Sequence, residues 1–84
     1  MDRVVYKKKA VKTLLRVQRP LADRSRRAFQ QIADGDTRGL DLKPLQGTDA
    51  RRLRIGTYRA ILEIVGDDLQ VLVLDIGPRG DAYK

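Results

Sequence analysis

The sequence predicts an α+β fold, in which a helical hairpin packs on one face of a small, mainly antiparallel β-sheet in the order β-α-α-β-β-β. Apolar residues recur at helical spacing between residues 8 and 33. From residue 51 onward the apolar period is two, which is typical of strands. Residues 69–76 are nearly all apolar, as expected for a central strand that is covered on both sides. The 84-residue chain fits one domain, residues 1–84.

A short strand and a helix are predicted at the start of the chain. Residues 2–6 form a β-type run, and residues 8–18 follow with a helical pattern. Val11, Leu14 and Leu15 fall at i, i+3 and i+4, so they are expected to share one apolar face. The basic residues of this helix lie mainly off that face.

Pro20 separates this helix from a second one, because proline suits the first turn of a helix but not its interior. Gly35 supplies the stop signal of the second helix. The apolar stripe of this helix consists of Leu21, Ser25, Ala28, Phe29 and Ile32. The very short joint at Pro20 predicts a hairpin of two helices.

A loop and three strands are predicted in the rest of the chain. Residues 34–49 predict a loop, because glycine and proline interrupt them repeatedly. The alternating pattern predicts strands at residues 51–55 and 58–65. Residues 66–68 carry a hairpin signal, and the apolar strand at residues 69–76 follows.

The composition excludes several kinds of site. The chain has no cysteine, which removes disulfides and thiolate chemistry, and no histidine, which removes the commonest metal ligand and the commonest general base near neutral pH. We therefore expect neither a metal nor another cofactor. No apolar run approaches the ~18 residues of a membrane span, and the N-terminal residues do not resemble a signal peptide, so a cytoplasmic protein is expected.

The positive charge is concentrated in the first part of the chain. Residues 1–33 hold ten basic and two acidic residues, a balance of +8; the whole chain is +7, so the remaining 51 residues sum to −1. A basic half indicates a polyanion or an acidic protein as partner. The alternative, which charge alone leaves open, is that lysine and arginine only solvate the helix faces.

Arginines on the predicted strands favour a binding face. Alternation places Arg52 and Arg54, and then Arg59 on the next strand, on the sheet face that points away from the helices. An ordinary solvated face is the alternative. Two observations argue against it: the planar guanidinium fork suits phosphate, and apolar Ile61 and Val65 are interleaved with these arginines.

Two segments resemble motifs of the RelE/ParE toxin superfamily. Residues 44–62 contain PLQG followed by RLRIGTYRAIL, which is similar to the PLxG turn and the RLRxGxYRxxY motif of that family. Residues 73–83, VLDIGPRGDAY, resemble its closing V…IGHRxxxY motif. The initial β-α-α order matches as well, so the resemblance covers essentially the whole chain.

The resemblance implies a toxin of a bacterial or archaeal toxin–antitoxin pair. RelE-type members cut mRNA in the ribosomal A site, whereas ParE-type members poison DNA gyrase and lack the nuclease residues. Carried over from the RelE branch, the catalytic candidates are Arg59, Arg79 and Tyr83, with Arg52 and Arg54 from the preceding strand. The implied partner is an acidic or partly disordered antitoxin protein.

Each candidate has an expected role. Arg59 and Arg79 stabilise transition-state charge, and Tyr83 either exchanges a proton beside cationic neighbours or stacks on a base. Two positions depart from the family pattern: Pro78 stands where a histidine or lysine is frequent, and Leu62 where an aromatic is frequent. Pro78 cannot transfer a proton, whereas the presence of Tyr83 favours the RelE branch.

The leading hypothesis is a ribosome-dependent mRNA endonuclease. The alternatives are a ParE-like gyrase inhibitor and a non-toxic basic module that binds nucleic acid or protein. Glu63 is expected to pair with Arg59 rather than to act in catalysis. The residues expected to bind RNA phosphates are Lys7, Lys8, Lys9, Lys12, Arg24, Arg26, Arg27, Arg51 and Lys84.

Overall fold

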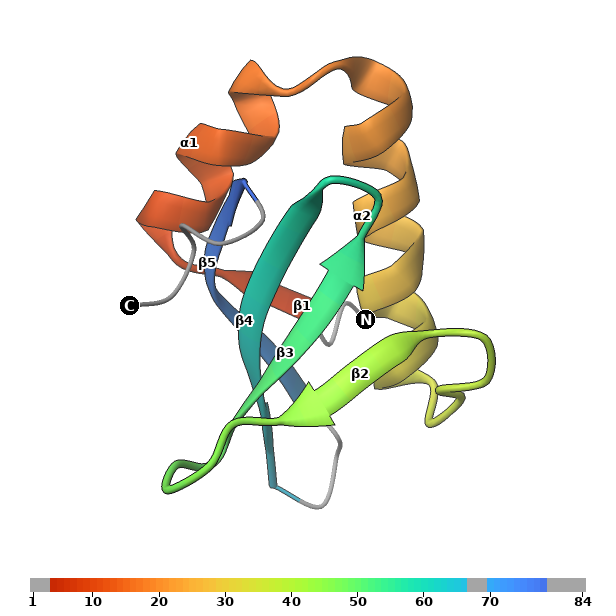
Figure 1. Ribbon diagram of the computed structural model, residues 1–84, viewed down its shortest axis with the longest axis vertical. Coiled ribbons are helices and arrows are strands. Elements are labelled where there is room, and N and C mark those ends of the chain that lie inside the picture. The colour runs from red at the N-terminus through yellow and green to blue at the C-terminus, as the bar shows by residue number, and fades with distance from the viewer. Residues whose placement is uncertain (1–3, 67–69, 79–84) are drawn as a thin grey trace.

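The computed structural model describes residues 4–66 and 70–78, which form two helices and a five-stranded sheet (Figure 1). The elements in chain order are β1 (Val4–Tyr6), α1 (Lys8–Arg16), α2 (Arg19–Ala33), β2 (Asp41–Pro44), β3 (Ala50–Ile55), β4 (Tyr58–Val65) and β5 (Gln70–Pro78). The strand order is β1-β5-β4-β3-β2. This architecture confirms the predicted α+β class.

The sheet is mixed but mainly antiparallel. Strands β2 to β5 form successive antiparallel pairs, while β1 runs parallel to β5 with Val4 beside Val71. A parallel neighbour requires a long crossover, and the hairpin of α1 and α2 supplies part of it. Both helices lie over the same face of the sheet (Figure 1). Their buried residues and those of the strands form one apolar core there.

Helix α1 buries a different stripe from the predicted one. Ala10 and Leu14 are buried, whereas Val11 and Leu15 are 39% and 77% exposed. Each residue of an α-helix is rotated by about 100° from the one before it, so Val11 and Leu15 turn away from the line that Ala10 and Leu14 form. The small Ala10 side chain lets the helix approach the sheet closely, and the prediction is wrong for Val11 and Leu15.

Helix α2 follows its predicted stripe closely. Phe29 and Ile32 are almost fully buried, and the Phe29 ring meets Tyr6 edge-on with centroids 5.8 Å apart. The Ser25 side chain is buried and its hydroxyl donates to the Leu21 carbonyl at 2.8 Å, which satisfies the polar group inside the core. The helix ends at Ala33, shortly before the positive-φ Gly35 predicted as its stop.

The predicted loop at residues 34–49 contains a strand. Residues 41–44 form β2, which pairs antiparallel with β3 at one edge of the sheet. This strand is short, polar and ends on Pro44, which an edge strand tolerates because one side of its backbone needs no partner. The strand signal was therefore weak, and the loop prediction is wrong for residues 41–44.

Strand β5 has helices over one face alone. Val71, Val73 and Ile76 belong to the core, while Leu72 and Leu74 on the other side are half-buried. The pairing between β4 and β5 is irregular near Ile61. Ile61 pairs with Asp75 and Leu62 pairs with Val73, so Leu74 lies between two paired residues. The expectation of a strand covered on both sides is thus met on one side. Within residues 4–66 and 70–78, neither helix has the length and apolarity needed to cross a membrane.

Candidate functional site

The sheet face turned away from α1 and α2, called the open face below, carries the arginines of β3 and β4. Leu53 and Ile55 are buried in the core beneath the helices. Arg52 and Arg54 alternate with them and therefore lie on the open face. Arg59 stands directly opposite Arg54 in the antiparallel pair, so it shares that face. We call Arg52, Arg54 and Arg59 the arginine cluster.

The arginine cluster is partly desolvated. The Arg52 and Arg54 side chains are 20% and 35% exposed, and Arg52 stands beside the buried Ile61. Among the described residues, none hydrogen-bonds the buried Nε atoms of Arg52, Arg54 and Arg59. Like charges opposite each other repel, and a buried donor without a partner costs about 1–3 kcal/mol. The cluster is therefore suited to an anion that brings oxygen acceptors, such as a phosphate.

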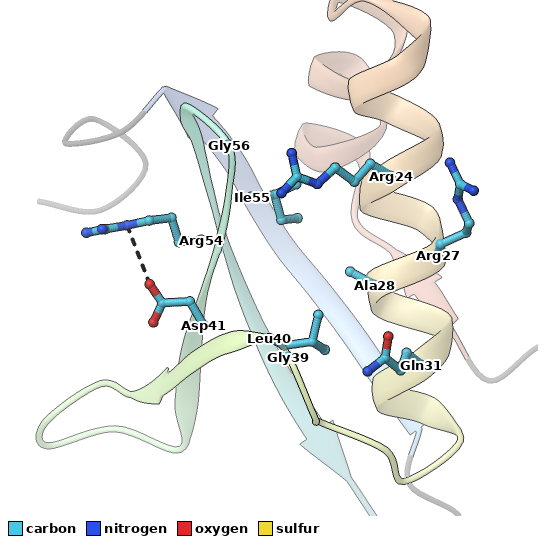
Figure 2. Close-up of a pocket in the computed structure, with 10 residues that line it drawn as sticks. All are labelled: Arg24, Arg27, Ala28, Gln31, Gly39, Leu40, Asp41, Arg54, Ile55 and Gly56. Carbon is cyan, nitrogen blue, oxygen red and sulfur yellow. Dashed lines mark ion pairs between the residues drawn. The ribbon is translucent and has the colours of Figure 1, made fainter.

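Asp41 on β2 is a member of this site that the sequence reasoning missed. Its Oδ1 lies 3.9 Å from Arg52 Nη2 and its Oδ2 lies 3.7 Å from Arg54 Nε. The β2–β3 register places Asp41 opposite Arg54, and Figure 2 shows the two side chains together on the side of β3 away from α2. The polar–apolar alternation of Asp41, Leu42 and Lys43 was the signal that could have revealed this strand and its carboxylate.

Glu63 does not take the role expected of it. Its partners across the ladder are Ala50 and Leu72, and it lies four residues along β4 from Arg59. Four residues of strand span about 13 Å, which is too far for an ion pair on a straight strand. The described residues hold no ion pair between Glu63 and Arg59, so that prediction is wrong, and Asp41 is the carboxylate beside the arginines.

Three of the predicted site residues, Arg79, Tyr83 and Lys84, lie outside the described residues. The described part of β5 ends beside the cluster: Gly77 pairs with Arg59, and Pro78 pairs with Tyr58. Because Gly77 has no side chain, β5 adds no bulk next to Arg59 at this point.

The other described residues that were predicted to bind RNA lie on or next to α1, on α2 and, for Arg51, on β3 beside Arg52. They are exposed, namely Lys7, Lys8, Lys9, Lys12, Arg24, Arg26, Arg27 and Arg51. Two of them make ion pairs across exposed surface, Lys9 with Asp75 at 3.6 Å and Arg26 with Asp23 at 3.2 Å. Surface pairs of this kind contribute about 0–1 kcal/mol, so both cations stay available to another anion.

A groove of about 420 Å³ runs between α2 and the β2–β3 edge of the sheet. Arg24, Arg27 and Gln31 of α2 form one wall, and Leu40 and Ile55 lie across from them (Figure 2). In Figure 2 the Arg54 side chain extends away from these helix residues, toward Asp41. Arg54 and Asp41 also line this groove, so the arginine cluster borders it at Arg54, although the Arg54 side chain extends away from the basic side chains of α2.

The chemistry available to the cluster is charge stabilisation. A guanidinium stays protonated at any ordinary pH, so it binds and neutralises an anion but does not take a proton. Three such groups on one face attract a phosphodiester, and most strongly its transition state, in which the phosphoryl oxygens gain negative charge. Proton transfer requires another group.

Comparison with known proteins gives one family. Residues 4–83 match the family described as the ParE toxin of type II toxin–antitoxin systems, parDE. No curated protein sequence matches the chain significantly.

Solved structures share the fold. The RelE–RelB complex from the archaeon Pyrococcus horikoshii OT3 has 29% identity and a TM-score of 0.74, over 96% of this chain and 98% of that chain. The RelB–RelE antitoxin–toxin complex from Methanococcus jannaschii has 23% identity and a TM-score of 0.73, over 89% of each chain. The toxin–antitoxin complex RelBE2 from Mycobacterium tuberculosis has 20% identity and a TM-score of 0.73, over 93% of this chain and 91% of that chain. The chain belongs to the ParE toxin family, within the RelE/ParE superfamily, and is a toxin of a type II toxin–antitoxin system.

Proposed function

We propose that this toxin inhibits translation as a ribosome-dependent mRNA endonuclease. The observation that carries the proposal is the arginine cluster, whose three buried Nε atoms have no acceptor among the described residues. A phosphodiester brings the oxygen acceptors and the negative charge that this cluster needs. An open sheet face also accepts a single strand, whereas an enclosed pocket does not.

The proposed reaction needs three things: a deprotonated 2′-hydroxyl, a stabilised pentavalent phosphate and a protonated 5′-oxygen. Arg52, Arg54 and Arg59 supply the second, with Arg79 as a further candidate. Tyr83 is the proposed group for proton transfer, because the chain has no histidine and Pro78 carries no titratable group. In the proposed reaction, as a phenolate beside the arginines, it takes the 2′-hydroxyl proton while the 2′-oxygen attacks phosphorus, and it returns that proton to the leaving 5′-oxygen. Such a site is chemically weak, so we expect most of the rate to come from the ribosome, which holds and orients the mRNA.

The exposed basic residues of α1 and α2 are the proposed contacts to ribosomal RNA phosphates. Arg24 and Arg27 line the same groove as Arg54, whose side chain extends away from them (Figure 2), so both sets of residues can be engaged at once. Contacts of this kind position the toxin without reading sequence. A cytoplasmic location, where ribosomes are found, follows from this proposal.

The proposed protein partner is a cognate antitoxin. The structural relatives from Pyrococcus horikoshii and Methanococcus jannaschii were solved as complexes of RelE with RelB. For this chain, an acidic antitoxin segment over the arginine cluster would supply the missing acceptors and block access of RNA.

A second candidate function is gyrase inhibition without catalysis. Two observations favour it: the matching family is that of ParE toxins, and Pro78 replaces the frequent proton-transfer residue. A third candidate, a non-toxic basic binding module, agrees with the charge but gives no reason for three buried Nε atoms that have no hydrogen-bond acceptor in the described part of the chain.

The test is controlled expression, with primer extension on cellular mRNA and a DNA-damage reporter in the same cells. We expect cuts at codon positions in translated mRNA and no reporter induction. The variant Arg59→Ala should abolish the cuts, while Arg38→Ala is the matched control, because Arg38 is 91% exposed and pairs with Asp36 in a loop. Reporter induction without cuts would establish gyrase inhibition instead.

A further inference from the structure

Asp41 is placed as a loose counter-ion of the arginine cluster. Its carboxylate oxygens lie 3.9 Å from Arg52 Nη2 and 3.7 Å from Arg54 Nε. Charge-assisted hydrogen bonds are about 2.7–2.9 Å long, so neither contact is one. The carboxylate thus offsets the positive charge of two arginines while it leaves their Nε donors without a hydrogen-bond acceptor among the described residues.

The strand pairing holds this carboxylate in place. Asp41 is directly opposite Arg54, which in turn is opposite Arg59, so the three side chains form one row across β2, β3 and β4. An RNA phosphate that binds Arg52 and Arg54 closely would stand next to the Asp41 carboxylate. The phosphate and the carboxylate would repel each other at such close range. The repulsion is stronger beside half-buried arginines than in bulk water, because the surroundings are less polar.

We propose that Asp41 is a specificity-determining residue, an internal anion that an RNA phosphate must displace from Arg52 and Arg54. This inference rests on the proposed function, since it takes RNA as the ligand of the cluster. Asp41 lowers the affinity of the cluster for free RNA, which engages few other residues. Ribosome-bound mRNA meets the same penalty, but the contacts of α1 and α2 with ribosomal RNA add to its binding, so at cellular concentrations that complex stays occupied while free RNA dissociates. The carboxylate therefore favours the ribosomal substrate over the bulk RNA of the cell.

The experiment measures binding of a fluorescently labelled oligouridylate of about 12 nucleotides, a length within the range that single-strand-binding domains cover. We expect Asp41→Asn to bind about five- to tenfold more tightly than the wild-type toxin at low salt. The slope of log affinity against log salt should steepen by about 0.7, as for one further phosphate neutralised on a single strand. The gain should fade at ~1 M salt, where charges are screened beyond about 3 Å.

Two matched variants show whether the effect depends on where the negative charge lies or only on the loss of one negative charge. Asp36→Asn removes the same charge from an exposed loop, where the Arg38 guanidinium holds the pKa of Asp36 below its usual range, and it should change the affinity less than about twofold. Asp41→Glu retains the charge beside the cluster and should keep the wild-type salt slope. A purely structural role of Asp41 would not produce a tighter complex.

The inference is overturned if Asp41→Asn binds no more tightly than Asp36→Asn, or if Asp41→Glu behaves like Asp41→Asn. The variants Arg52→Ala and Arg54→Ala distinguish this from failure of the proposed function. If they weaken binding while Asp41→Asn equals Asp36→Asn, the cluster binds RNA and the inference about Asp41 alone fails. If they leave binding unchanged, the RNA site itself is wrong, and the inference falls with it.

Discussion

The two faces of the sheet differ in how completely their side chains are satisfied. On the face beneath the helices, apolar side chains such as Leu53, Leu62 and Val73 are wholly buried in one core. On the open face, half-buried Arg54 and Arg59 stand opposite each other, and the Asp41 carboxylate lies 3.7 Å from Arg54 and 3.9 Å from Arg52. The first face stabilises the fold, whereas the second retains unsatisfied charge that a ligand can use.

The largest expected effect is on the covered face. Leu62→Ala should lower the free energy of unfolding by about 2–5 kcal/mol, because it removes a fully buried side chain and leaves a cavity. Val65→Ala is the matched control on the same strand, since Val65 is 44% exposed, and it should cost less than about 0.5 kcal/mol. Urea unfolding measures both, and equal losses would mean that the two faces do not differ as described.

The next effect concerns the arginine cluster and has the opposite sign. Arg59→Met should leave the free energy of unfolding unchanged or raise it by about 1 kcal/mol. It removes a buried Nε donor that has no acceptor within residues 4–66 and 70–78, and it removes one of two facing charges. The same variant should lose toxicity. Thermal unfolding measures the stability of this variant, and a growth assay measures its toxicity. A strong loss of stability would show that Arg59 stabilises the fold rather than binding a ligand.

The smallest effect sharpens the comparison on helix α1. Leu15→Gln should change the free energy of unfolding by less than about 0.5 kcal/mol, because Leu15 is 77% exposed. Its neighbour Leu14 is 6% exposed, and Leu14→Ala should cost about 2–5 kcal/mol. If urea unfolding showed that Leu15→Gln greatly lowers the free energy of unfolding, Leu15 would belong to the buried face, as the sequence pattern predicts.

Most of the fold could be predicted from the local spacing of apolar residues in the sequence. The alternation along residues 51–65 placed Arg52, Arg54 and Arg59 on the open face correctly, because the side-chain period of a strand is fixed. The stripe of α2 and its stop near Gly35 also follow from local periodicity.

The missed features depend on pairing between distant segments. Strand β2 is paired with β3, and the polar–apolar alternation of its four residues is too short to indicate a strand strongly. Without β2 the role of Asp41 was invisible, and Glu63 was chosen as the counter-ion in its place. On α1, the spacing of Val11, Leu14 and Leu15 allowed two nearby faces, and only contact with the sheet decides which one is buried.

The most direct test of the central claim uses purified toxin and an mRNA held in the A site of programmed ribosomes. We expect wild-type toxin and Arg38→Ala to cleave this mRNA rapidly and free mRNA negligibly, while Arg59→Met cleaves neither. Cleavage of A-site mRNA by Arg59→Met at the wild-type rate would contradict the account, because the arginine cluster would then play no part in the reaction.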